Sequence, residues 1–199
     1  MVDFITSASS STFNGFSYNL DIKRRTMDVL LAKIREVLTP EYLKSLITKN
    51  GNTQVPERKY IVKIKEILNG LGYTFEEAGS QSCKDFRNIN NIGINIEMKK
   101  TDSFNIICND TCPNDEIDYV IIFTGKEYTR QRNIEPQIIH INGGDIVKMS
   151  PWHTECKEDL NNGKNKWCRG ENKKNLPGIL RVYWRPSWQF DIRSLLVTQ

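Results

Sequence analysis

An aspartate, a glutamate and a lysine stand close together near the middle of the chain, at Asp85, Glu97 and Lys99. From Gly93 onward apolar and polar residues alternate, as in a strand with one buried face, so Glu97 and Lys99 share the polar face. Turn-forming residues precede this strand, and a reversal centred near Asn91 sets Asp85 opposite Glu97, with α-carbons roughly 5 Å apart. The sequence therefore predicts a hairpin that brings two carboxylates and one ammonium group into a small patch.

Two carboxylates held this close repel each other unless a cation lies between them. Mg²⁺ prefers hard oxygen ligands, so we expect Asp85, Glu97 and the backbone carbonyl of Met98 to hold Mg²⁺. A metal ion in this position would polarise a phosphodiester and lower the pKa of bound water. Lys99 would orient the attacking water or stabilise the charge that develops on the phosphate.

The order of Asp85, an eleven-residue gap and Glu-Met-Lys at 97–99 resembles the motif of the PD-(D/E)xK nuclease superfamily, and of type II restriction endonucleases in particular. The resemblance covers residues 56–123. Lys84 stands where the motif has proline. The resemblance implies an α/β fold with a restriction-endonuclease-like core, a mixed β-sheet flanked by α-helices, in which the two acids and the lysine are catalytic.

The function implied by this resemblance is that of a Mg²⁺-dependent type II restriction endonuclease. Such an enzyme is a homodimer that hydrolyses double-stranded DNA at specific sequences and leaves 5′-phosphate and 3′-hydroxyl ends. A DNA repair or recombination nuclease of the same fold would carry the same catalytic residues. A third alternative is a non-catalytic or zinc-stabilised nucleic-acid-binding module, because a half-buried antiparallel strand often carries a Glu and a Lys on its wet face.

Periodicity places helices before the motif and strands around it. We expect a loose arm or strap over the first twenty residues, and then helices over residues 22–38, from Pro40 through Ile47, and from Pro56 to Gly70. We expect strands at 73–78, 84–87, 93–99, 104–108, 117–123 and 137–141, a short helix at 144–149, an irregular polar region and a late strand at 179–184.

The helix that begins at Pro56 should lie on the sheet. Glu57 falls on the same side of this helix as Tyr60 and Ile61. The resemblance to PD-(D/E)xK nucleases implies that such a helix can contribute a further carboxylate, and Glu57 is then the candidate that supports a second metal ion. A glutamate in a first turn is equally well explained by its interaction with the helix dipole.

The segment from Lys148 to Arg193 carries ten basic and five acidic residues and all four tryptophans. Such a mixture suits clamping of DNA phosphates and reading of base edges. It is as typical of a solvated loop region whose tryptophans simply pack. The candidate DNA contacts in the chain are Lys84, Asn109, Arg169, Lys173 and Lys174.

Five cysteines, an odd number, argue against a disulfide framework and indicate reduced thiols. One zinc ion would have as possible ligands Cys108, Cys112, His153, Cys156 and Cys168. Their spacing matches no paired-knuckle pattern well, so scattered thiols are the more ordinary interpretation.

A chain of 199 residues suits one domain, divided here into an N-terminal arm with helices (1–55), a catalytic core (56–141) and a basic, Trp-rich region (142–199). The net charge of +4 is compatible with a nucleic-acid partner without establishing one. The first twenty residues lack a basic, apolar signal pattern, and no apolar run has the length of a membrane span. We therefore expect an intracellular, cytoplasmic protein with no membrane partner.

Overall fold

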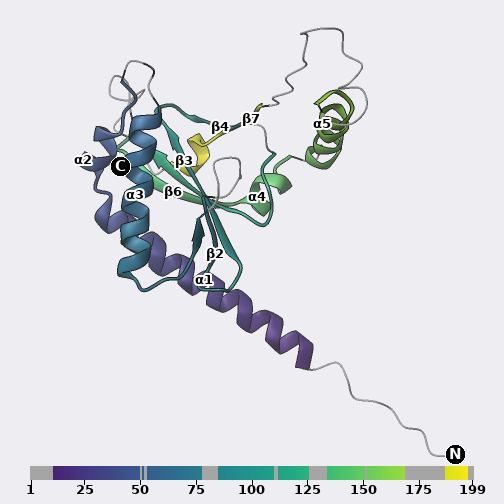
Figure 1. The fold of residues 1–199 in the computed structure, drawn as a ribbon, viewed down its shortest axis with the longest axis horizontal. Helices are drawn as coiled ribbons and strands as arrows, with labels where there is room; N and C mark the ends of the chain where they lie inside the picture. The colour runs from purple at the N-terminus through teal and green to yellow at the C-terminus, as the bar shows by residue number, and fades with distance from the viewer. Residues whose placement is uncertain are drawn as a thin grey trace, which may run out of the picture.

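The computed structural model describes residues 11–49, 51, 53–77, 85–109, 112–125, 134–150, 152–168 and 187–196. Its centre is a five-stranded mixed sheet with helices packed against one face and a two-stranded sheet near the other (Figure 1). The predicted α/β architecture, a mixed sheet flanked by helices, is therefore present. Within the described ranges, no helix is both long and apolar enough to cross a membrane.

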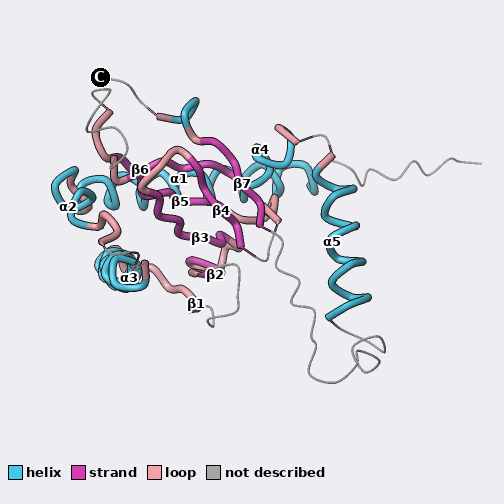
Figure 2. Tube along the Cα trace, turned by 90° about the horizontal axis from the view of Figure 1, so that it is seen from above, coloured by secondary structure: helices cyan, strands magenta, loops and turns pink. Residues whose placement is uncertain are grey.

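The strands of the central sheet lie in the order β1-β2-β3-β5-β6. Strand β3 runs parallel to β5, and the other neighbours in this sheet are antiparallel. Their bounds are β1 Glu76–Glu77, β2 Phe86–Ile89, β3 Ile94–Thr101, β5 Asp118–Phe123 and β6 Gln137–Asn142. Strands β4 (Asn105–Asn109) and β7 (Ser187–Asp191) pair antiparallel as the second sheet. Figure 2 shows this pair beside β3.

Three helices precede the sheet along the chain, namely α1 Ser11–Val37, α2 Pro40–Ser45 and α3 Gln54–Gly70. Their apolar stripes pack on one face of the sheet, where Leu30 and Ile34 of α1 and Ile64 and Leu68 of α3 are fully buried. Each such side chain contributes about 1.5–3 kcal/mol on burial. These helices therefore hold the face of the sheet that lies behind the candidate site.

Strand β5 separates two hydrophobic cores. Val120 and Ile122 point into the helix-covered core, whereas Tyr119, Ile121 and Phe123 point into the core under β4 and β7. A strand with both faces buried is expected to be almost continuously apolar, as this one is. The prediction of a central strand at 117–123 is confirmed.

A buried polar network fixes the end of β3. Lys100 forms an ion pair with Asp102 at 2.6 Å, and Asp102 also accepts hydrogen bonds from the Thr48 amide (3.0 Å) and the Thr124 hydroxyl (2.7 Å). Every bond in this network is charge-assisted, which makes it stronger than a bond between neutral groups. The network ties the segment after α2 to the ends of β3 and β5.

Helices α4 (Gly143–Lys148) and α5 (His153–Cys168) follow the sheet. Helix α5 stands away from the sheet, on the side opposite α2 and α3 (Figures 1 and 2). The prediction of an irregular region is therefore wrong for residues 153–168, which form a helix. The apolar residues of α5 are few, with Cys156 and Leu160 half-buried on the same side as the buried His153. The His153 Nε2 contacts the Pro113 carbonyl at 3.0 Å.

The expected loose arm is wrong for residues 11–20, which continue α1 toward the N-terminus and project beyond the sheet (Figure 1). Once a helix is nucleated by its packed part, each added residue costs little, and this segment contains no proline. Other elements are shifted by a few residues. Helix α2 ends at Ser45, two residues before Ile47, and the first strand is reduced to Glu76–Glu77. The strand expected at 179–184 lies outside the described residues.

The start of α4 provides a test of this packing. A β-carbon at Gly143 would lie 1.8 Å from the Asn114 carbonyl oxygen, whereas one at Gly70, near the end of α3, would meet nothing within 4 Å. We expect Gly143→Ala to lower the free energy of unfolding by at least about 2 kcal/mol, because the backbone must move. Gly70→Ala should leave it unchanged or raise it by up to about 1 kcal/mol. Urea denaturation followed by circular dichroism measures both, and equal stabilities for the two variants would contradict the packing described.

Candidate active site

The turn between β2 and β3 is built from asparagines in the left-handed backbone region. Asn88, Asn90 and Asn91 have φ values of 49°, 54° and 57°, and Gly93 has 72°. Asparagine and glycine are the residues that adopt this conformation at least cost. The Asn88 side chain strengthens the turn because its Oδ1 accepts a hydrogen bond from the Gly93 amide at 3.1 Å.

The two strands of this hairpin pair in the register that the sequence predicts. Phe86 lies opposite Ile96, and the amide of Asp85 donates a hydrogen bond to the Ile96 carbonyl at 2.9 Å. Asp85 therefore lies next to Glu97, just before β2 begins. An irregularity in the pairing between Phe86 and Ile89 absorbs the longer turn.

Asp85 is fixed by the backbone of β3. Its Oδ2 accepts a hydrogen bond of 2.7 Å from the amide of Met98. Met98 itself points into the helix-covered core and is buried. The carboxylate of Asp85 is thus held against the strand that carries Glu97 and Lys99.

Glu97 and Lys99 form an ion pair. Lys99 Nζ donates to Glu97 Oε1 at 2.6 Å, and only 12% of the Glu97 side chain and 22% of the Lys99 side chain are exposed. The second carboxylate oxygen, Glu97 Oε2, is buried and has no hydrogen-bond partner in the described structure. A buried carboxylate oxygen without a partner is costly, so this atom is available to a ligand that carries positive charge.

The electrostatics of the patch are dominated by burial. Desolvation raises the pKa of Glu97 to about 7, although the neighbouring Lys99 ammonium acts in the opposite direction. Desolvation also raises the pKa of Asp85, with Glu57 adding to this shift while the Met98 amide and Lys99 oppose it. Burial disfavours the Lys99 ammonium, but Glu97 outweighs this effect and the pKa of Lys99 is raised. Desolvation therefore outweighs the attraction between Glu97 and Lys99, and Glu97 holds its proton more readily than a glutamate in solvent does.

Glu57 and Tyr60, at the start of α3, add to the field of this patch. The Glu57 side chain is exposed, and its charge raises the pKa of both Asp85 and Glu97. Its support for a second metal ion stays a prediction. Tyr60 is buried, and desolvation together with the charges of Glu57, Asp85 and Glu97 raises the pKa of its phenol.

The motif does not predict two residues that lie near the site, Tyr60 and Cys108. Tyr60 is three residues after Glu57 on the same side of α3, and that spacing was a signal in the sequence. Cys108 on β4 has no such signal, because only the packing of the second sheet brings it near Lys99 and Glu97. Burial raises the pKa of the Cys108 thiol to about 11. This thiol is therefore uncharged where it lies near the site.

The predicted DNA contacts are not tested by this structure. Lys84, Arg169, Lys173 and Lys174 lie outside the described residues. Asn109 is the last residue of β4, and its side chain is not described. Among the tryptophans, Trp152 is exposed and stacks on Trp188 of β7, with ring centroids 6.4 Å apart.

The zinc hypothesis gains no support from the described residues. Cys108 is buried, Cys112 and Cys156 are partly buried, and all three are free thiols. The side chain of Cys168 is not described, and His153 is engaged with the Pro113 carbonyl. Within the described ranges, no group of three or more His, Cys, Asp and Glu side chains converges as a metal site would require. The same finding means that any ion at Asp85 and Glu97 would rest on two carboxylates and backbone or substrate oxygens.

Comparisons with models of protein families, with curated proteins and with solved structures gave no match. The chemistry of the site therefore has to be argued from its own residues.

The raised pKa of Glu97 predicts how stability depends on pH in metal-free protein. Between the unfolded value of 4.5 and the folded value of about 7, the folded chain holds a proton that the unfolded chain has lost. The free energy of unfolding should therefore fall as pH rises through this window, by up to about 3 kcal/mol. Urea denaturation in EDTA from pH 4.5 to 8 measures the fall.

Glu97→Gln is the matched variant for this measurement, because it keeps the shape of the side chain and removes the titrating group. We expect its stability to exceed that of the wild type above pH 7 and to vary less across the window. Parallel curves for the two proteins would show that Glu97 titrates normally and is not desolvated as described.

Proposed function

We propose that this chain is a Mg²⁺-dependent nuclease that hydrolyses phosphodiester bonds in double-stranded DNA. The observation that carries the proposal is the patch of Asp85, Glu97 and Lys99, in which one carboxylate oxygen of Glu97 is buried without a partner among the residues that the structure describes. The three residues stand in the order of the PD-(D/E)xK motif, with Asp85 immediately before β2 and with Glu97 and Lys99 on β3. The helix α3, the β2–β3 hairpin and the parallel strand β5 around them are compatible with a restriction-endonuclease-like core.

The residues of the patch fit a divalent cation. With all groups ionised, the carboxylates of Asp85, Glu97 and Glu57 outweigh the Lys99 ammonium by two charges. Asp85, Glu97 and the Met98 carbonyl offer the hard oxygen ligands that Mg²⁺ prefers, and Glu57 would support a second ion. When bound, Mg²⁺ supplies Lewis acidity toward the phosphodiester and lowers the pKa of bound water.

The chain's own groups perform the remaining tasks. The Met98 amide holds the Asp85 carboxylate in one orientation. Glu97 sets the position of the Lys99 ammonium through their 2.6 Å contact, so the ammonium is placed to orient water and to stabilise charge that develops on the phosphate. Hydrolysis adds one water across the P–O3′ bond and yields a 5′-phosphate and a 3′-hydroxyl.

A type II restriction enzyme is the role that we favour among nucleases of this chemistry, with cutting at specific sequences, a homodimeric state and a cytoplasmic location. A repair or recombination nuclease would share the same catalytic residues. The pattern of products separates the two, because a restriction enzyme leaves discrete fragments from phage or plasmid DNA.

The proposal predicts the behaviour of three variants. Wild-type protein with Mg²⁺ should cut mixed plasmid and phage DNA, and EDTA should abolish cutting. Asp85→Asn, Glu97→Gln and Lys99→Ala should each lower the cleavage rate by at least about a hundredfold, because each removes a group that acts on the metal, the water or the phosphate. Gel electrophoresis of time courses measures the rates.

Glu66→Gln is the control, since Glu66 lies on the same helix as Glu57 but pairs with Lys63 in solvent. It should cut at the wild-type rate. Thermal melting of each variant shows that the loss of activity is not a loss of folding. Cleavage that requires Mg²⁺ but survives in all three site variants would overturn the assignment of the site, and a wild type that binds DNA without cutting it would favour the non-catalytic module.

A further inference from the structure

Strands β4 and β7 form a two-stranded antiparallel ribbon that has one buried and one exposed face. Ile106 and Cys108 of β4 point into the core beneath the ribbon and are buried. Side chains alternate along a strand, so Asn105 and Ile107 point to the other side. Ile107 lies opposite Gln189 of β7, which therefore shares this side. We call the surface made by Asn105, Ile107 and Gln189 the outer face of the ribbon.

The outer face presents two amides and one apolar side chain. Asn105 and Gln189 are exposed, and their side-chain amides form no hydrogen bond within the described part of the chain. Ile107 is 51% exposed. Asp191, which lies opposite Asn105, is neutralised by an ion pair in which Arg193 Nε donates to Asp191 Oδ2 at 2.7 Å. A partner of this face would therefore meet hydrogen-bonding and apolar groups and little net charge.

The end of the ribbon next to β3 is fixed by hydrogen bonds. The hydroxyl oxygen of Thr101, the last residue of β3, lies 2.9 Å from the carbonyl oxygens of Ser103 and Asn105. The same oxygen accepts a hydrogen bond of 3.0 Å from the Ser103 amide. The Ile192 amide, just after β7, donates to the Phe104 carbonyl at 2.9 Å. The ribbon therefore begins at a fixed place relative to the strand that carries the candidate site.

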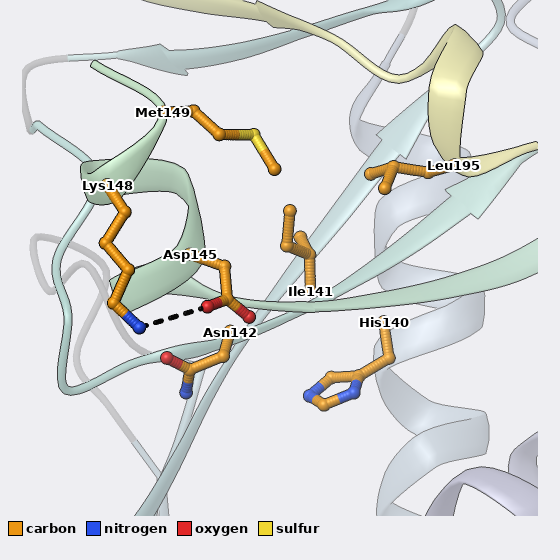
Figure 3. Close-up of a pocket in the computed structure, with 7 residues that line it drawn as sticks. All are labelled: His140, Ile141, Asn142, Asp145, Lys148, Met149 and Leu195. Atoms are coloured by element: carbon orange, nitrogen blue, oxygen red, sulfur yellow. Dashed lines mark hydrogen bonds and ion pairs between the residues drawn. The ribbon is translucent and has the colours of Figure 1, made fainter. Parts of the chain in front are cut away.

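The chain after β7 also holds the ribbon against the central sheet. The short 3₁₀ helix Arg193–Leu195 brings Leu195 to a cavity of about 490 Å³, which Ile141 of β6 and Met149 also line (Figure 3). Leu195 and Leu196 pack against the core beneath the ribbon. Since both strands are anchored, little conformational entropy would be lost when the outer face binds a partner.

The ribbon is continuous with the candidate site. Cys108 of β4 lies near Lys99 and Glu97, whereas its neighbour Ile107 belongs to the outer face. The ribbon also lies beside β3 in Figure 2. A DNA duplex whose phosphate lies at the candidate site would therefore pass alongside β4.

The chemistry of the outer face matches the base edges of DNA. The major groove is wide enough to admit a two-stranded ribbon. Asparagine and glutamine form paired hydrogen bonds with N6 and N7 of adenine, and apolar side chains contact the methyl group of thymine. Ile107 is the only large apolar side chain of this face among the described residues, so the face lacks the apolar area of a typical protein interface.

We propose that the ribbon enters the major groove of duplex DNA and that its outer face reads A·T base pairs. Asn105 and Gln189 would each hydrogen-bond an adenine, and Ile107 would contact a thymine methyl group. This proposal rests on the proposed function, because it takes DNA to lie at the candidate site. It adds the residues that select the sequence to be cut.

Selection from a random-sequence duplex library tests the proposal with the full chain. DNA bound in Ca²⁺ and DNA cut in Mg²⁺ are recovered separately and sequenced. Asn105→Ala and Gln189→Ala should each lower the preference for adenine at one position by roughly five- to a hundredfold. Gln189→Glu should move the preference at its position toward cytosine, because a carboxylate accepts a hydrogen bond from cytosine N4. A merely structural role of Gln189 would not produce this change.

Replacement of thymine by deoxyuridine tests the apolar contact, since it removes only the methyl group. The wild type should bind DNA with this replacement at one position several-fold more weakly, and Ile107→Ala should bind both DNAs equally. Val62→Ala is the matched control, because Val62 is 54% exposed on α3. It should retain the wild-type preference. Thermal melting shows whether each variant is folded.

The two recoveries separate this proposal from the proposed function. Sequence preferences that persist unchanged in Asn105→Ala, Ile107→Ala and Gln189→Ala would overturn the role of the ribbon and leave the nuclease standing. Binding or cutting without any base preference would do the same. A wild type that binds preferred sequences but does not cut them in Mg²⁺ would overturn the nuclease and leave the ribbon. DNA that is neither bound nor cut would overturn both and leave the outer face to a protein partner.

Discussion

The hydrogen bond from the Met98 amide to the Asp85 carboxylate is the interaction on which the candidate site depends. It forms because Phe86 pairs with Ile96, which leaves Asp85 immediately before the start of β2 and beside Glu97. The side chains of a strand alternate, so a slip of one residue would turn Glu97 to the opposite face and place it in the apolar core. The buried residues of β3 forbid that slip. The register of β3 that packs the hydrophobic core is therefore also the register that places Glu97 beside Asp85.

The buried carboxyl groups of the site destabilise the folded chain. Burial raises the pKa of Glu97 and Asp85, and one oxygen of Glu97 lacks a partner among the described residues, so ionising these carboxyl groups costs free energy. Elsewhere buried charges are compensated, as at Asp102, which receives bonds from Lys100, Thr48 and Thr124. The difference between these two carboxylate clusters is informative. One is satisfied and structural, whereas the other is left incomplete, as a site that binds a cation would be.

The hairpin could be predicted from the sequence because its signals are local. Asn88, Asn90, Asn91 and Gly93 favour positive φ, and the alternation after Gly93 fixes which residues share a face. The second sheet could not be predicted in this way. Cys108 pairs with Trp188 across a long stretch of chain, and no short-range pattern identifies such a partner. Helix α5 was missed for a different reason, since its apolar residues, Cys156, Leu160 and Trp167, are too few for their helical period to stand out among polar residues.

The most direct test of the central claim is to locate a metal ion. Mn²⁺ prefers the same oxygen ligands as Mg²⁺ and gives an anomalous diffraction signal, so crystals of the wild type grown with Mn²⁺ can show where it binds. The account predicts an anomalous peak about 2.1 Å from Glu97 Oε2 and bonded also to Asp85. A map with no peak at these carboxylates, and with Glu97 Oε2 hydrogen-bonded to a protein group instead, would contradict it.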